Sequence, residues 1–202
     1  MDPRRQRTAE ALLRAAEEIF STRGVEEVTV EEIAQKAGVA VGSIYNHFGS
    51  KSGLHAAVIE QALDVDRGYM DRAYKRERTP AEQLYAAADE YLEFYLAHPE
   101  YFRMLAFPGE PGQYAAGREV AERLARSVDG QNRRMVEALR RGMDAGVIRA
   151  IDPAEAATVL WAAWNGVISL GWRPDSLRRT NPELRELLHT ATDIVANGLL
   201  AR

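Results

Sequence analysis

The sequence predicts an all-α protein with a helical head at its N-terminus and a larger helical body. Apolar residues recur at helical spacing along most of its 202 residues, and no convincing strand pattern interrupts them. Helix-starting motifs support this prediction, because Thr29 with Glu32 and Thr79 with Glu82 have the spacing of capping boxes. We therefore expect a chain built of helices throughout.

Residues 29–54 predict two short helices joined by a tight turn. The first begins at the Thr29 cap and ends at Gly38, and a second apolar stripe begins at Val41. The second helix therefore packs on the first by that stripe. Its other side stays free and carries uncharged residues able to form hydrogen bonds: Gly42, Ser43, Tyr45, Asn46 and His47. Such a face fits a helix whose outer side enters the major groove of DNA.

The order of these residues resembles the DNA-binding signature of the TetR family of bacterial transcriptional repressors. The family pattern is close to T-x-x-x-I-A-x-x-A-G-V-S-x-G-x-L/I-Y-x-H-F-x-S-K, and this chain follows it from Thr29 to Lys51. A preceding A-A-x-x-x-F-x-x-x-G pattern is matched from Ala15 to Gly24. The chain departs from the family at Ala40, where Ser or Thr is usual, so the second helix loses a side-chain cap that contributes about 1 kcal/mol.

The resemblance implies that residues 1–49 form a DNA-binding head and residues 50–202 form a body that binds a ligand and dimerises. It implies that eight residues bind a double-stranded, palindromic DNA operator: Thr29, Val41, Gly42, Ser43, Tyr45, Asn46, His47 and Lys51. Tyr45 and Lys51 are expected to contact phosphates at the edge of the groove. Ser43 and Asn46 are expected to contact base edges, with Val41 offering methyl groups to thymine.

The charge of the chain does not by itself suggest a nucleic-acid partner. The formal net charge is −4, and residues 4–51 hold seven basic and seven acidic side chains. Binding to DNA must then come from local contacts rather than from bulk charge. Arg4, Arg5 and Arg7 have two interpretations: an arm that follows the DNA backbone, or a frayed and solvated terminus.

Composition excludes several other classes of protein. No window approaches the roughly 18 uninterrupted apolar residues that a membrane span needs, and the N-terminus lacks the apolar region of a secretory signal. We therefore expect a cytoplasmic protein with no membrane partner. The absence of cysteine excludes disulfides and thiolate metal sites, and no metal or other cofactor is predicted.

Helices continue along the remaining chain. They are expected from about Thr8 to Arg23, from Ser50 to Arg76, from Thr79 to the residue before Pro99, in a short segment after it, from Ala115 to Asp144, from Asp152, and from Asn181. Residues 107–112, FPGEPG, predict a break.

The last two of these helices carry more apolar surface than an outer helix needs. The resemblance implies that they pair with those of a second subunit as a four-helix bundle, which makes the protein a homodimer. A small, flat surface suited to such packing is offered by Ala156, Val159, Ala163 and Val167. The alternative is that both helices only close the core of the monomer.

Aromatic residues are dense in the middle of the chain, and two interpretations compete. One is an ordinary helical core. The other, implied by the resemblance, is a pocket for a small apolar or aromatic effector. Its expected residues are Tyr91, Phe94, Tyr95, Phe102, Met135, Trp161, Trp164 and Asn165. Asn165 interrupts an apolar run and needs a hydrogen-bond partner, which a ligand, the backbone or water could supply.

No catalytic motif is found, so we do not expect an enzyme. The four histidines lie far apart, and neither H-E-x-x-H, G-x-S-x-G nor a phosphate-binding loop is present. The prediction is a ligand-responsive transcriptional regulator, a repressor that a small effector releases from its operator. Two alternatives stay open: a ligand-blind DNA-binding adaptor with the same head, and a helical small-molecule binder or enzyme whose head binds protein.

Overall fold

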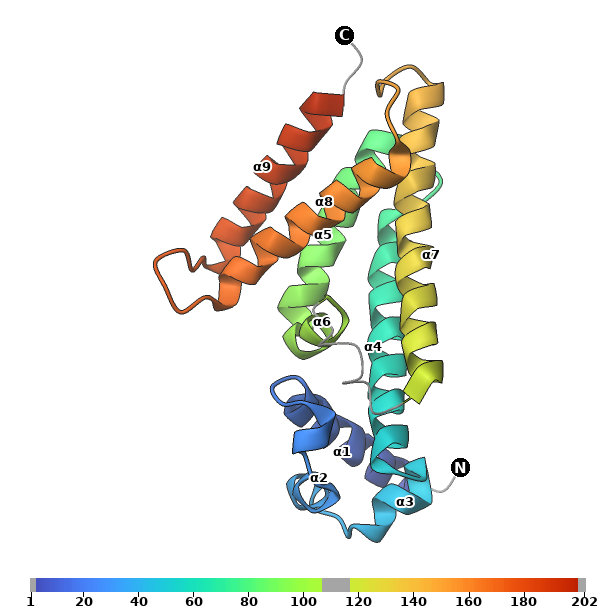
Figure 1. The fold of residues 1–202 in the computed structure, drawn as a ribbon, viewed down its shortest axis with the longest axis vertical. Coiled ribbons are helices and arrows are strands. Elements are labelled where there is room, and N and C mark those ends of the chain that lie inside the picture. Colours follow the sequence, from blue (N-terminus) through green and yellow to red (C-terminus); the bar gives the residue numbers. More distant parts are fainter. Residues whose placement is uncertain (1–2, 107–116, 200–202) are drawn as a thin grey trace. The chain divides into compact units, whose positions relative to one another are not determined.

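A computed structural model of the chain describes residues 3–106 and 117–199 (Figure 1). These residues form an all-α fold, as the sequence predicts, with no strand among them. The α-helices are α1 (Pro3–Phe20), α2 (Val30–Ala37), α3 (Gly42–Phe48), α4 (Lys51–Ala73), α5 (Pro80–Ala97), α6 (Pro99–Ala106), α7 (Gly117–Asp144), α8 (Pro153–Ser169) and α9 (Asn181–Leu199). Two short 3₁₀ turns, η1 (Val25–Glu27) and η2 (Leu170–Trp172), were not predicted. Of the helices described, none has both the length and the apolar character needed to span a bilayer.

The helices group into two compact units whose limits differ from the predicted boundary after residue 49. The first unit comprises Met1–Val65 with His98–Arg126, and the second comprises Asp66–Ala97 with Ser127–Arg202. The difference arises because α6 packs on α1, and because the first part of α4 packs there too: the His55 ring meets the Phe20 ring edge-on. Helix α4 thus begins in the first unit and ends in the second.

Local capping explains the start and end of α2 in the first unit. The Thr29 hydroxyl accepts a hydrogen bond from the Glu32 amide, and the Glu32 carboxylate accepts one from the Thr29 amide. The predicted capping box is therefore confirmed. Gly38 ends α2 with a φ of 68°, in the left-handed region that glycine adopts without strain.

Helix α1 begins earlier than the sequence suggested. It starts at Pro3 rather than near Thr8, so Arg4, Arg5 and Arg7 lie on a helical turn and not on a frayed arm. Proline at the first position favours such an early start, because its φ is already helical and it has no N–H to satisfy. All three arginine side chains are exposed.

Capping interactions also define the starts of helices in the second unit. Thr79 and Glu82 form the predicted capping box at the start of α5. Asp152 Oδ1 accepts hydrogen bonds from two amides in the first turn of α8. At the start of α9, the Glu183 carboxylate accepts hydrogen bonds from the amide and the hydroxyl of Thr180. Helix starts predicted at these sites are therefore confirmed.

Helix α9 lies beside α8 and packs on α5 (Figure 1). Inside the unit, the Trp164 indole donates a 3.0 Å hydrogen bond to the Thr192 hydroxyl, which joins α8 to α9. Ionic and polar contacts hold α9 to α5: Arg185 with Glu93, His189 with Asp89, and Tyr85 with Asp193. One side of α9 thus packs against α5 and α8 of the same protomer.

Candidate nucleic-acid interface

Helix α3 presents one apolar side to the protein and one polar side to solvent. Ile44 is fully buried, whereas Gly42, Tyr45 and Asn46 are exposed, and the Tyr45 side chain is 53% accessible. Positions 42, 45 and 46 follow helical spacing and therefore share a face. This face is short, uncharged and rich in hydrogen-bonding groups.

The other residues predicted on α3 lie at its edges. Ser43 and His47 are half-buried on the flanks, and Val41 is half-buried at the residue before the helix. No side chain caps this helix, which agrees with the expected effect of Ala40; instead the Ser43 amide donates to the Ala40 carbonyl at 2.9 Å. Of the residues expected to contact bases, Asn46 is therefore exposed, whereas Ser43 and Val41 are half-buried.

Thr29 is used within the protein. Its hydroxyl accepts from the Glu32 amide and donates to the Glu32 carboxylate at 3.1 Å. The single hydroxyl proton is thus already engaged, and a phosphate would have to compete for it. Glu32 is also paired with Arg23 at 2.9 Å. The Arg23 guanidinium, with the Thr29 amide and hydroxyl, lowers the pKa of Glu32 to about 2.

Lys51 lies at the first residue of α4, but its ammonium points back toward the protein. It donates hydrogen bonds of 2.7 Å to the carbonyl oxygens of Val25 and Val28, and its side chain is half-buried. These carbonyls belong to η1 and to the segment that enters α2. The motif lysine therefore positions the helix-turn-helix, a role that the sequence did not suggest.

Seven of the eight residues predicted to bind a ligand belong to the second unit, and the eighth does not. Tyr91, Phe94 and Tyr95 lie on α5, Met135 on α7, and Trp161, Trp164 and Asn165 on α8. Phe102 lies on α6 and belongs to the first unit, because that helix packs on α1.

The polar groups among these residues find partners inside the protein. The Tyr91 hydroxyl donates to Asn165 Oδ1 at 3.0 Å, and Asn165 Nδ2 donates to the Trp161 carbonyl at 2.9 Å. Burial raises the pKa of Tyr91, so its hydroxyl stays protonated. Asn165 therefore does not depend on a ligand for its hydrogen bonds.

The second unit also contains a buried carboxyl group that was not predicted from the sequence. Asp66 on α4 is only 8% exposed and accepts a 2.7 Å hydrogen bond from Gln131 Nε2 on α7. Burial raises the pKa of Asp66 to about 6. The amide oxygen of Gln131 is buried and has no hydrogen-bond partner within the described part of the chain.

A sequence signal for Asp66 did exist. The buried stripe of α4 runs through Ile59, Ala62, Met70 and Ala73, and Asp66 continues it at helical spacing. An acidic residue on such a stripe predicts a buried carboxyl group. The unpaired oxygen of Gln131 depends on the packing of α7 and had no comparable signal.

Comparison with known proteins identifies the family. Residues 12–58 match the family described as bacterial regulatory proteins, tetR family. Residues 84–195, more than half of the chain, match the tetracyclin repressor-like C-terminal domain. The chain belongs to the TetR family.

A curated relative shows how far this similarity extends. Over 103 residues the chain is 30% identical to the HTH-type transcriptional activator FasR of Mycolicibacterium smegmatis, covering 51% of this chain and 47% of FasR. The chain thus spans less than half the length of the curated relatives it matches first.

Two solved structures match the fold over nearly the whole chain. The TetR family transcriptional regulator PfmR from Thermus thermophilus has a TM-score of 0.76 at 25% identity, covering 94% of this chain and 99% of PfmR. A SmeT–triclosan complex has a TM-score of 0.70 at 25% identity, covering 96% of this chain and 92% of SmeT.

The dimer surface predicted from the TetR resemblance is partly open in the protomer. Val159 on α8 is 55% exposed and Ile194 on α9 is 68% exposed. Ala163 and Val167 are half-buried. Ala156 is buried within the protomer, so it is not part of an open surface. The turn of α8 that carries it faces inward, next to Ala157 and Leu160.

Proposed function

We propose that this protein is a transcriptional regulator that binds a palindromic DNA operator as a homodimer. The polar outer face of α3 carries this proposal: Gly42, Tyr45 and Asn46 are exposed on a helix whose opposite side is anchored by Ile44. A helix braced in this way can enter the major groove, where an asparagine side chain can form two hydrogen bonds with adenine.

Phosphate contacts would supply orientation rather than sequence discrimination. Tyr45 is exposed at the edge of the polar face, and one N–H of Lys51 remains after its two carbonyl contacts. Arg5 and Arg7, exposed on the first turns of α1, can add to these contacts. Because the net charge is −4, such contacts must be local, and affinity should depend strongly on salt.

Dimerisation through α8 and α9 would supply the two-fold symmetry that a palindrome requires. On α9, the half-buried Leu187 and Ala191 and the exposed Ile194 form an apolar stripe at helical spacing. On α8, Val159 and Ala163 form a second stripe of this kind. In a dimer, α8 and α9 of the two subunits would form a four-helix bundle that buries all four apolar stripes. A dimer can occupy two half-sites about 34–36 Å apart, which multiplies affinity over that of one head.

The effector response is proposed to act through the second unit. The residues suited to receive an apolar or aromatic effector are Tyr91, Phe94, Tyr95, Met135, Trp161, Trp164 and Asn165, while Phe102 belongs to the first unit. Asp66 and Gln131 add buried hydrogen-bond acceptors to the same unit, so an effector with one or two donor groups fits better than a purely apolar one.

Helix α4 offers a physical route for such a response, because it is continuous from Lys51 in the first unit to Ala73 in the second. A ligand that favoured one position of this helix would need a coupling free energy of only about 1–3 kcal/mol to change operator occupancy measurably. A regulator that leaves its operator when the effector binds acts as a repressor while the effector is absent. That a SmeT structure contains triclosan supports an aromatic effector by analogy.

Selection of bound DNA from a random pool tests the proposal. We expect enrichment of a palindrome with half-sites about one helical turn apart. The selected DNA should then be titrated by fluorescence anisotropy against the wild type, Asn46→Ala and the control Asn132→Ala on α7. Absence of any enriched sequence would favour a head that binds protein. Enrichment without displacement by a panel of aromatic compounds would favour the ligand-blind adaptor.

A further inference from the structure

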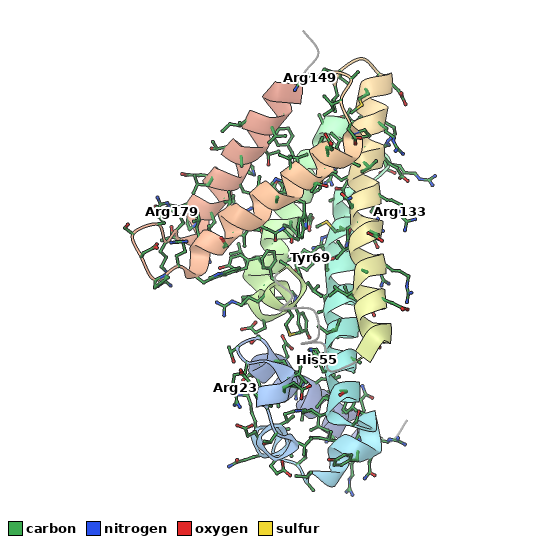
Figure 2. The ribbon with its side chains drawn as sticks, in the orientation of Figure 1. Arg23, His55, Tyr69, Arg133, Arg149 and Arg179 are labelled. Carbon is green, nitrogen blue, oxygen red and sulfur yellow. The ribbon has the colours of Figure 1, made fainter. Side chains whose placement is uncertain are left out.

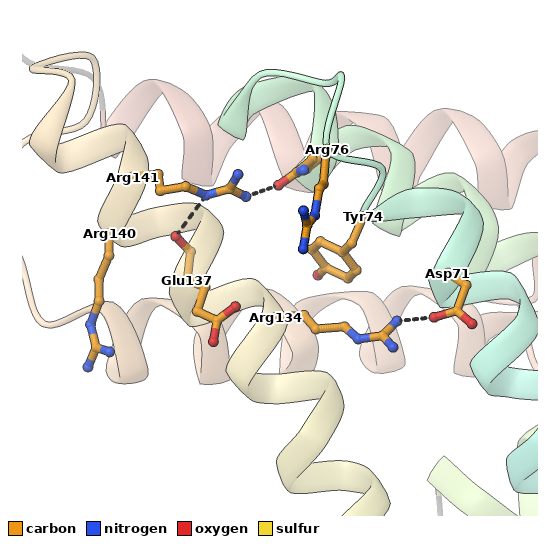
Figure 3. A pocket seen from close by; sticks show the side chains of 8 residues that line it. Asp71, Tyr74, Arg76, Arg134, Glu137, Arg140 and Arg141 are labelled. Carbon is orange, nitrogen blue, oxygen red and sulfur yellow. Dashed lines mark hydrogen bonds and ion pairs between the residues drawn. The ribbon is translucent and has the colours of Figure 1, made fainter.

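The second unit carries an arginine-rich pocket that is distinct from the aromatic residues considered above. Its volume is about 710 Å³, within the range of small-molecule sites. Figure 3 shows it between the C-terminal end of α4, the segment that follows, and the last turns of α7. Four arginines line it: Arg76 after α4, and Arg134, Arg140 and Arg141 on α7.

Two of these arginines are held in place by the protein. Arg134 pairs with Asp71 at 2.7 Å. Arg141 donates to the side-chain oxygen of Gln83, which is itself buried and donates to the Lys75 carbonyl at 2.7 Å. Their guanidinium groups are therefore fixed before any ligand arrives, which lowers the entropy lost on binding.

The other two arginines have no such anchor. Arg76 and Arg140 are exposed, and neither side chain forms a hydrogen bond or an ion pair with another residue of the described ranges 3–106 and 117–199. Figure 3 shows the Arg76 side chain beside Tyr74 and the Arg140 side chain pointing away from it. Each guanidinium is therefore a separate uncompensated charge of the lining, and an anionic group can neutralise it.

The rest of the lining also favours an anion. Burial raises the pKa of Tyr74, so its hydroxyl keeps its proton and can donate a hydrogen bond. Among the described lining residues, only two carboxylates, Asp71 and Glu137, stand against the four arginines, and Asp71 is already paired. Glu137 is thus the lining group that opposes an anionic ligand.

We propose that this pocket binds a small molecule with at least two negative charges, carried by phosphate or carboxylate groups. Guanidinium forks match both oxyanions in a bidentate geometry, and Arg76 and Arg140 supply the two free forks. The site goes beyond the proposed operator and effector functions, and its occupancy can be measured without DNA. A failure to bind DNA would therefore leave this proposal untouched.

The test uses the full chain, with calorimetry and thermal melts at matched ionic strength. Pyrophosphate and citrate are the two probes, and sodium chloride is the reference. The test variant is Arg76→Gln with Arg140→Gln. A control variant, Arg133→Gln with Arg149→Gln, removes the same charge from positions outside the pocket (Figure 2). Glu137→Gln is the third variant.

We expect at least one probe to raise the melting temperature above the chloride reference. Its affinity should fall about tenfold or more in the test variant, remain unchanged in the control, and increase in Glu137→Gln. Binding of pyrophosphate alone would identify a phosphate ligand, and binding of citrate alone a polycarboxylate. Equal losses in the test and control variants, or no binding of either probe to the wild type, would overturn the proposal.

Discussion

The Lys51 ammonium donates a 2.7 Å hydrogen bond to the carbonyl oxygen of Val28, 23 residues earlier in the chain. A second hydrogen bond of the same length reaches Val25. Both valines are buried. The first residue of α4 is therefore fixed to the segment that leads into α2, and the lysine of the recognition motif has a structural role in addition to its proposed phosphate contact.

Replacing Lys51 with alanine should affect both roles. Loss of two hydrogen bonds from a charged donor should lower the free energy of unfolding by about 2 kcal/mol, measured by urea denaturation without DNA. Loss of a phosphate contact should lower the slope of log affinity against log salt by about one. Lys36→Ala is the matched control, because its pairing with Glu18 is exposed and should contribute less than about 1 kcal/mol.

The two measurements separate the two roles of Lys51. A loss of stability with an unchanged salt slope would show that Lys51 only holds η1 and α2 in place. A reduced slope without a loss of stability would mean that the carbonyl contacts contribute little in solution.

Asn46 and Tyr45 should differ in what they contribute to DNA recognition. Asn46→Ala should change the selected consensus at one base pair per half-site and cost about 1–3 kcal/mol of discrimination there. Tyr45→Phe removes only a hydroxyl, so it should weaken all sequences alike. Parallel selections with the two variants check this. An unchanged consensus with Asn46→Ala would show that Asn46 does not read a base.

Sequence reasoning succeeded where the determining interactions are local. The boxes at Thr29 and Thr79 join groups three residues apart, so their spacing alone predicts them. The Lys51 clamp joins a side chain to backbone carbonyls more than twenty residues away, and backbone acceptors leave no trace in residue identity.

Long-range packing also determines other features that the sequence does not predict. Phe102 lies in the first unit because α6 packs on α1, and helix periodicity cannot say which partner an apolar face will meet. The arginine pocket requires Arg76 and three residues of α7 to converge across more than fifty positions. Neither follows from spacing, whereas the helices themselves do.

The exposed apolar side of α9 leads to a prediction about assembly. Ile194→Arg should weaken the dimer by about 100-fold or more, because a charge buried without a partner in an apolar interface is costly. Val147→Arg, at a site 52% exposed after α7, is the matched control. Sedimentation over a concentration series should show monomers for the first variant only. If both variants stay dimeric, the interface lies elsewhere.

His55 should make the first unit less stable in acid. It is buried beside Phe20, and burial lowers its pKa to about 4. Because the unfolded histidine has a pKa near 6.5, the unfolded chain binds more protons between these values, so stability is complete above pH 6.5 and falls toward pH 4. The expected loss between pH 7 and pH 5 is about 2 kcal/mol.

Urea titrations of the wild type and His55→Leu at several pH values check this expectation. The leucine variant should lose that acid-dependent part of the stability, whatever its absolute stability. If the two proteins show the same pH dependence, His55 does not titrate with a lowered pKa.

Asp66 should act in the opposite direction. Its folded pKa of about 6 lies above the ordinary value of an aspartate, so the folded state binds the extra proton. The stability that it contributes is therefore present below about pH 4 and is lost as the pH rises through 6. The hydrogen bond from Gln131 and the charges of Arg134 and Arg67 reduce this rise in pKa but do not cancel it, because burial dominates.

Asp66→Asn removes the buried charge while keeping an oxygen for the Gln131 amide. The variant should be more stable than the wild type by about 3 kcal/mol at pH 7.5, and this advantage should shrink to near zero by pH 4. Asp64→Asn, at an exposed position of the same helix, is the control for the removal of one carboxylate. Urea titrations at several pH values measure the difference. An advantage that did not change with pH would mean that Asp66 ionises normally, and then the second unit would offer an effector no unusual buried acid.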